Sequence, residues 1–144
     1  MIKKKKELKK KLFKLYEKYA KEIKQQSQLD KSNLENSFNL AELISDWIQK
    51  KLQLIRLKTE LEKEKSKIFK ELYEYYKMDY EIELKRSEVN DLIKSDEQII
   101  EIDELLSLTK EVMNLIDTSI EILKLKHWER RDYLEYLKFI NGIT

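Results

Sequence analysis

Hydrophobic residues recur at intervals of three and four along most of this chain, which is the spacing of one face of an α-helix. The spacing predicts four helices, over residues 3–26, over 39–78, from after Ser87, and from Ser95 to Asn141. Ser95 and Gln98 fit a capping box that begins the last helix, and Gly142 is placed to end it. We therefore expect an all-α fold built on a long antiparallel helical hairpin, with additional N-terminal and C-terminal helices. A break near Leu125 stays open.

The last helix carries more hydrophobic surface than one partner helix can cover. The seam that faces the hairpin partner comprises Ile99, Ile102, Leu106, Met113, Ile116, Ile120 and Leu123. A second seam makes the hydrophobic surface roughly 200° wide. Either the N-terminal helix folds back over this second seam, or another copy of the protein covers it. We favour a homo-oligomer, held together by Leu105, Leu108, Val112, Leu115, Leu134, Leu137 and Ile140.

Composition agrees with a single helical domain. The 144 residues include one glycine, no proline and no cysteine, so a glycine-rich nucleotide loop and a disulfide framework are both excluded. We expect residues 1–26 to form a basic N-terminal helix, in one domain with the hairpin and C-terminal oligomerisation helix of residues 27–144. No stretch approaches the ~18 consecutive apolar residues of a membrane-spanning helix.

Charge is distributed unevenly along the chain. The net charge is +2, but residues 1–24 carry eleven lysines against three glutamates, whereas residues 79–121 carry thirteen acids against four bases. One part of the protein should therefore attract polyanions while another repels them.

Catalytic chemistry has few candidates. His127 is the one histidine, and Lys124 stands where a Glu-x-x-His metal pair would need a glutamate. With no cysteine nucleophile, no zinc spacing and no calcium loop, we expect no enzyme activity, no metal and no cofactor.

Basic residues form a row along the second predicted helix. Arg56, Lys63, Lys70 and Lys77 recur every seven residues, opposite the hydrophobic seam, and Lys67 lies on the same face. Heptad positions are ~10.5 Å apart along a helix, so the row could follow a phosphate backbone. The alternative is an ordinary solvated face.

Aromatic residues accompany this row. We expect Tyr75 to lie in the hairpin core, while Phe69, Tyr73, Tyr76 and Tyr80 flank the seam. Rings beside lysines suit the stacking of single-stranded bases, at ~1–3 kcal/mol each. Packing of the same rings against the N-terminal helix is an equal alternative.

The segments "KELYEYY", "SEVNDLIKSDEQI" and "KHWERRDYLEYLKFINGIT", in this order, resemble the UvsY family of phage recombination mediators, which load a recombinase onto single-stranded DNA. The resemblance covers roughly residues 30–142. The matching C-terminal positions are Lys126, Trp128, Arg131, Leu134, Phe139 and Gly142. The chain departs from the family pattern at Asn39, where a proline is common, and at Leu72, where an arginine is common.

The resemblance implies a single-stranded-DNA site at Lys65, Lys70, Tyr75 and Tyr76, and a ring-shaped homo-oligomer. It also implies a phage recombinase and a single-strand-binding protein as partners, in the cytoplasm of the infected bacterial host. Combined with the basic row, the predicted DNA-binding residues are Arg56, Lys63, Lys65, Lys67, Lys70, Tyr73, Tyr76 and Lys77.

Two other functions remain open at this point. A helical-bundle or coiled-coil scaffold would use the tyrosines as core and the lysines for solubility. A peripheral membrane protein would use the basic N-terminal helix, although its apolar face of Leu8, Leu12 and Leu15 is narrow.

Overall fold

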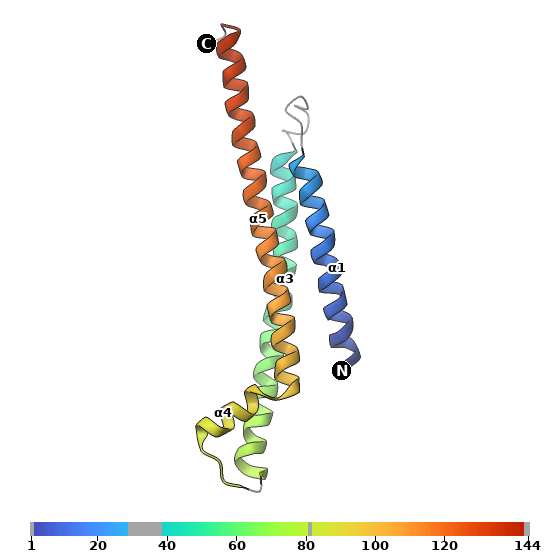
Figure 1. Ribbon diagram of the computed structural model, residues 1–144, viewed down its shortest axis with the longest axis vertical. Coiled ribbons are helices and arrows are strands. Elements are labelled where there is room, and N and C mark those ends of the chain that lie inside the picture. Colours follow the sequence, from blue (N-terminus) through green and yellow to red (C-terminus); the bar gives the residue numbers. More distant parts are fainter. Residues whose placement is uncertain (1, 29–38, 81, 143–144) are drawn as a thin grey trace. The chain divides into compact units, whose positions relative to one another are not determined.

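The computed structural model describes residues 2–28, 39–80 and 82–142, which are helical almost throughout (Figure 1). The elements in chain order are α1 (Ile2–Ser27), α3 (Leu40–Glu74), the π-helical turn η1 (Tyr75–Asp79), α4 (Arg86–Lys94) and α5 (Glu97–Ile140). No strand occurs in these ranges, so the expected all-α fold is confirmed. Helix α5 continues without interruption past Leu125.

The start of α5 differs from the prediction. Asp96 is its N-cap, because the backbone N–H of Gln98 donates to Asp96 Oδ1 at 2.9 Å. The predicted capping box at Ser95 was wrong, because Ser95 is instead the C-cap of α4. Its hydroxyl donates to the Leu92 carbonyl at 3.0 Å, and its backbone N–H to the Asp91 carbonyl at 3.2 Å. The Ser95 hydroxyl bonds back to the preceding turn, and the side chain that accepts from the first turn of α5 is that of Asp96.

The end of α5 follows the prediction. Gly142 adopts a φ of 69°, the left-handed conformation that ends many helices and that glycine adopts without strain. Its N–H donates to the Phe139 carbonyl at 3.2 Å, and the Asn141 N–H donates to the Leu137 carbonyl at 3.0 Å. These bonds satisfy carbonyl groups that the last helical turn leaves free.

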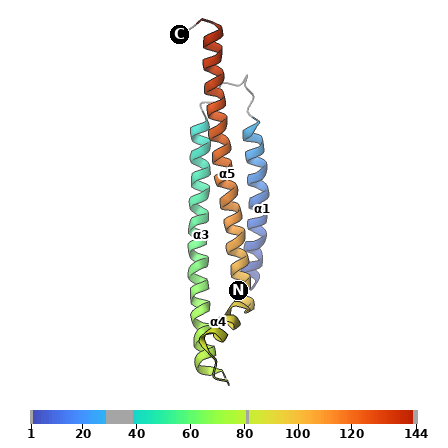
Figure 2. The ribbon, with the colours of Figure 1, turned by 60° about the vertical axis from the view of Figure 1, so that its left-hand side comes forward.

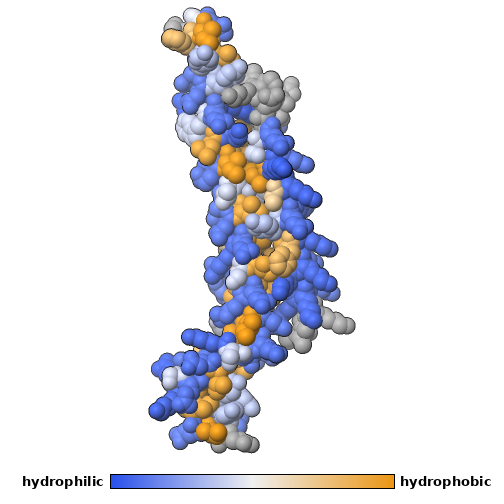
Figure 3. Space-filling model, in the orientation of Figure 1, coloured by the Kyte–Doolittle hydropathy of each residue, from blue (hydrophilic) through white to orange (hydrophobic). Residues whose placement is uncertain are grey.

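Two compact units make up the chain, and α1, α3 and α5 each contribute to both. The first unit comprises Met1–Phe13 and Leu54–Glu111, and the second comprises Lys14–Gln53 and Val112–Thr144. Hydrophilic side chains cover most of the face seen in Figure 3, as expected for a chain in which 40% of residues are charged.

In the first unit, parts of α1, α3 and α5 pack around a hydrophobic core that α4 completes (Figure 2). Its buried residues are Leu12, Leu54, Leu61, Ile68, Val89, Ile93, Ile99, Ile102, Leu105 and Leu106. Ion pairs surround this core, at 3.6 Å between Lys5 and Glu64 and at 3.2 Å between Lys9 and Glu104. Both pairs attach α1 to its neighbours within this unit.

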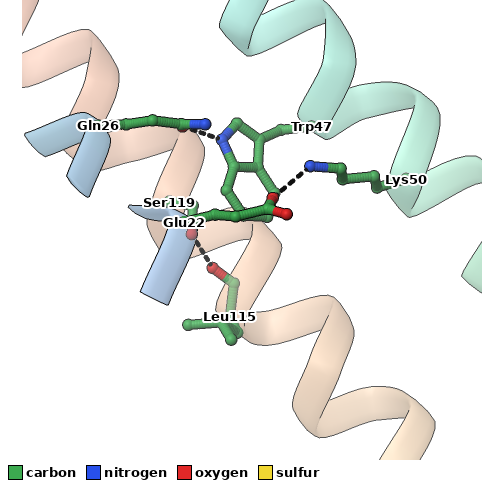
Figure 4. Close-up of polar contacts among 6 residues, drawn as sticks. All are labelled: Glu22, Gln26, Trp47, Lys50, Leu115 and Ser119. Atoms are coloured by element: carbon green, nitrogen blue, oxygen red, sulfur yellow. Dashed lines mark hydrogen bonds and ion pairs between the residues drawn. The ribbon is translucent and has the colours of Figure 1, made fainter. Parts of the chain in front are cut away.

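In the second unit, Trp47 of α3 is fully buried and holds α1 in place (Figure 4). Its indole Nε1–H donates to Gln26 Oε1 at 2.8 Å, and the Tyr19 ring meets it edge to face with centroids 5.3 Å apart. Lys50 lies over the Trp47 ring at 4.4 Å and pairs with Glu22 at 2.6 Å. This cluster joins α1 to α3 by hydrophobic, aromatic and charged contacts together.

Helix α1 reaches the second seam of α5 at Leu105 in the first unit. Leu105 is 2% exposed and Val112 is 1% exposed within the single chain. In the first unit, Leu8 of α1 and Leu61 of α3 line a cavity together with Leu105. The N-terminal helix therefore covers part of the second seam, which was the alternative to a second copy of the protein.

Candidate nucleic-acid interface

The outer face of α3 carries the predicted basic row. Arg56, Lys63 and Lys70 are exposed at seven-residue intervals, and Lys67 is exposed beside them. The opposite face of the helix is buried at Leu54, Leu61 and Ile68. The 3.6-residue period thus places hydrophobic residues inside and bases outside in this stretch.

The row ends where the α-helix ends. Helix α3 stops at Glu74, and η1 follows as a π-helical turn that contains Lys77. A π-helix closes its hydrogen bonds over five residues instead of four, so it rotates the following side chains out of the heptad register. Lys77 is exposed and lies within this turn, beyond the α-helix that carries Arg56, Lys63 and Lys70.

The tyrosines lie at and around this turn. Tyr75 is 48% exposed, so its predicted place in the hairpin core was wrong. Tyr75 is the first residue of η1, in which no residue is buried. Tyr73 and Tyr76 are half-buried, while Phe69 and Tyr80 are exposed.

Three of these rings form a cluster in η1 and just after it. Tyr75 and Tyr76 lie 5.2 Å apart, Tyr76 and Tyr80 lie 5.4 Å apart, and Tyr75 and Tyr80 lie 6.2 Å apart, all edge to face. Such edge-to-face pairs are favourable. Burial, followed by the charge of Asp96, raises the pKa of Tyr76 above its ordinary value of 10.0.

Lys65 lies apart from the exposed row. Its Nζ pairs with Asp103 of α5 at 2.7 Å within the first unit, so its charge is partly neutralised. Lys67 lines a cavity with Lys5 and with four glutamates, Glu64, Glu71, Glu97 and Glu101. The structure therefore brings Arg56, Lys63, Lys67 and Lys70 together on one face and directs Lys65 toward α5.

The sequence matches the family described as "Recombination, repair and ssDNA binding protein UvsY" over residues 22–143. The chain belongs to this family. The expected resemblance to the UvsY family is thereby confirmed, and the match spans α3, η1, α4 and α5 as well as the end of α1. No curated protein and no solved structure matches the chain.

The UvsY family match places the basic row and the tyrosine cluster inside the shared region, while the part of α1 before residue 22 lies outside it. Among the described residues, no group of three or more histidine, cysteine or acidic side chains could hold a metal ion. Within the same part of the chain, no helix is long and apolar enough to cross a membrane.

The residues predicted to mediate oligomerisation fall into two groups. Leu105 and Val112 are buried, and Leu108 and Leu115 are half-buried, along the stretch of α5 that packs within the two units. Toward the C-terminus, Leu134 and Ile140 are exposed and Leu137 is half-buried. Only the C-terminal group still presents exposed apolar surface to a second copy.

Two features were missed from the sequence. Ile48, Leu52 and Ile55 form an exposed apolar row on α3, and their four- and three-residue spacing was a signal that could have found them. Arg130 is only 8% exposed, and its Nη1 and Nη2 atoms have no hydrogen-bond partner in the described part of the chain. Nothing in the local sequence distinguishes Arg130 from the exposed Arg131.

Proposed function

We propose that this protein is a recombination mediator that binds single-stranded DNA without sequence preference along the outer face of α3. Membership of a family described by recombination, repair and ssDNA binding supports the class of ligand. The observation that carries the site is the exposed row of Arg56, Lys63 and Lys70, with Lys67 beside it, on the face opposite a buried core.

The chemistry of the row suits a phosphate backbone. Lysine ammonium groups bind phosphates as mobile point charges, and an arginine guanidinium can bind two phosphate oxygens at once. None of these four side chains has an acidic partner within 4.0 Å in the described ranges, so all four charges remain available. Because such contacts ignore base identity, binding would not depend on sequence.

The tyrosine cluster supports a preference for single strands. The exposed rings of Tyr75 and Tyr80, with the half-buried ring of Tyr76 between them, follow the basic row along the chain. Unpaired bases can stack on such rings, whereas bases in a duplex are already stacked on each other. Phosphate binding along α3 would then be combined with stacking at η1.

We propose further that copies of the chain associate through the exposed residues near the C-terminus of α5, including Leu134 and Ile140. Several copies would present several basic rows, and their combined binding would exceed that of one row. In this function the assembly holds the strand while a phage recombinase replaces a single-strand-binding protein. No catalytic step is required of the protein itself.

The experiment is fluorescence anisotropy with labelled oligo-dT and with a duplex of equal length, over a range of salt concentrations. The test variant changes Lys63, Lys67 and Lys70 to glutamine, which retains helix propensity. The control variant makes the same change in charge at exposed lysines elsewhere, Lys85, Lys94 and Lys110.

We expect wild type to bind oligo-dT more tightly than duplex. The test variant should flatten the slope of log K against log salt by about 2, since each lost single-strand phosphate contact is worth about 0.7. The control variant should leave the slope near that of wild type. Absence of binding by wild type at low salt would reject the proposal and leave a helical scaffold. If the test variant shows the same salt slope as the control variant, the DNA site does not lie on α3.

A further inference from the structure

The outward face of α1 is the most strongly charged surface of the described chain that the proposed function does not use. Eight of its lysines are exposed: Lys4, Lys6, Lys10, Lys11, Lys14, Lys18, Lys21 and Lys24. Only Glu7 and Glu17 oppose them among the exposed residues of this helix. Hydrophilic side chains line the outer edge of α1 in Figure 3.

The lysines of α1 divide by the direction in which they point. Lys5 and Lys9 pair with Glu64 and Glu104, and these pairs hold α1 against the first unit. None of the eight exposed lysines has an acidic partner within 4.0 Å in the part of the chain that the structure describes. Like charges at a spacing of four destabilise a helix, so the packing of α1 does not explain this face.

The face is also held in a fixed conformation. Trp47 bonds to Gln26 at 2.8 Å, and Lys50 bonds to Glu22 at 2.6 Å, so the C-terminal part of α1 is fastened to α3 within the second unit. In this unit, Lys14 and Lys18 lie about 6 Å apart along the axis of α1. A row of charges that is already ordered binds a ligand with less loss of conformational entropy than a flexible arm.

We propose that the outward face of α1 is a second contact surface for the backbone of single-stranded DNA, separate from the row on α3. This inference rests on the proposed function and extends it to a helix that lies largely outside the family match, which begins at residue 22. The surface binds phosphates through lysines, and the exposed rings of Phe13 and Tyr16 offer unpaired bases a place to stack.

The apolar side of α1 argues for nucleic acid over a membrane surface. An interfacial helix inserts its apolar face among lipid tails. In α1 that face is occupied, because Leu12 is buried in the first unit and Tyr19 and Ile23 are buried in the second. Of the large hydrophobic side chains of α1, only Phe13 and Tyr16 are exposed in the described part of the chain, which leaves no continuous apolar face to insert.

Acidic side chains separate the two basic surfaces in the first unit. The cavity lined by Lys5 and Lys67 also contains Glu64, Glu71, Glu97 and Glu101. The four carboxylates repel phosphates, so a strand meets Lys67 from the exposed side of α3, and α1 and α3 contact different stretches of DNA. Each protomer should accordingly occupy more nucleotides than the α3 row alone would require.

The test compares three variants of the full chain by oligo-dT anisotropy over a range of salt concentrations, with far-UV circular dichroism as a check on folding. The first changes Lys10, Lys14, Lys18 and Lys21 to glutamine. The second changes Lys63, Lys67 and Lys70, and reports on the proposed function alone. The charge-matched control changes Lys85, Lys94, Lys110 and Lys124, all exposed on other parts of the chain.

We expect the α1 variant to flatten the salt slope by up to about 3 and to occupy fewer nucleotides per protomer in stoichiometric titrations. An α1 variant that matches the control, while the α3 variant loses binding, overturns this inference and leaves the proposed function intact. Loss of all oligo-dT binding in wild type overturns both. Wild-type binding to anionic phosphatidylserine vesicles that the α1 variant loses, with an unchanged DNA slope, assigns the face to lipid and overturns the inference.

Discussion

Replacement of Trp47 by phenylalanine should measure how firmly α1 is attached to α3 in the second unit. Trp47 is fully buried, donates its indole N–H to Gln26 at 2.8 Å, and lies under Lys50 at 4.4 Å. Phenylalanine keeps an aromatic ring near Tyr19 but removes the donor and part of the ring volume. The substitution therefore isolates the hydrogen bond and the fit of the indole from general hydrophobicity.

The expected loss of stability has two parts. The net contribution of one hydrogen bond to stability is about 1 kcal/mol, and the loss of this bond leaves the partly buried Gln26 side-chain carbonyl without its donor. The smaller ring leaves a void in a packed site, which costs about 1 to 2 kcal/mol on the scale of large-to-small core substitutions. We expect Trp47→Phe to lower the free energy of unfolding by roughly 2 to 3 kcal/mol, a large share of the stability of a domain of this size.

Urea unfolding followed by far-UV circular dichroism measures this change, and an unchanged m-value shows that the native state stays compact. Gln26→Met and the double variant complete a mutant cycle with Trp47→Phe. The sum of the stability losses in the two single variants should exceed the loss in the double variant by about 1 kcal/mol, because each single variant removes the same hydrogen bond. A loss below about 0.5 kcal/mol for Trp47→Phe, or strict additivity in the cycle, would refute the attachment of α1 through this residue.

Three further predictions follow from individual side chains. Burial, and then the charge of Glu22, raises the pKa of Tyr19 above its ordinary 10.0, so the stability this group contributes is complete below pH 10 and is lost as pH rises through the folded pKa. Tyr19→Phe should therefore decline less in its urea midpoint between about pH 9 and pH 11 than wild type, and an identical decline would contradict this. Asp103→Asn releases Lys65 from its 2.7 Å pair and should steepen the oligo-dT salt slope by about 0.7, whereas an unchanged slope would show that Lys65 never reaches the strand. Arg130→Met should raise the free energy of unfolding of the isolated chain by about 1 kcal/mol or more, because it removes buried donors that lack acceptors; a marked fall in the thermal midpoint would reveal a partner for the guanidinium.

Spacing along the chain was sufficient to predict the helices. The recurrence of apolar residues at three and four places α3 and α5 close to their observed limits, and Gly142 ends α5 because it adopts a φ of 69°. The same periodicity orients Arg56, Lys63 and Lys70 outward from α3. These features depend on residues within one or two turns of each other, and this is the range over which sequence alone determines conformation.

Tertiary structure decided which partner each helix face meets. A second seam on α5 could have been covered by another copy or by α1, and burial of Leu105 and Val112 within one chain was not specified by their spacing. Spacing did not distinguish Lys65 from the neighbouring lysines, whereas the structure pairs it with Asp103 of α5. Contacts between residues far apart in sequence depend on how helices pack, and many packings satisfy one amphipathic pattern.

The tyrosine cluster shows most clearly which features follow from spacing along the chain and which follow from tertiary structure. Heptad spacing assigned Tyr75 to the core, but Tyr75 is 48% exposed and contacts Tyr76 and Tyr80 in and just after the π-turn Tyr75–Asp79. Likewise, Ser95 had the right identity to cap α5, yet its hydroxyl bonds to α4 and leaves Asp96 as the cap. The sequence alone determined an amphipathic helical chain with a basic outer face. Which aromatic rings are exposed near that face depends on how the helices pack, and only the tertiary structure decided this.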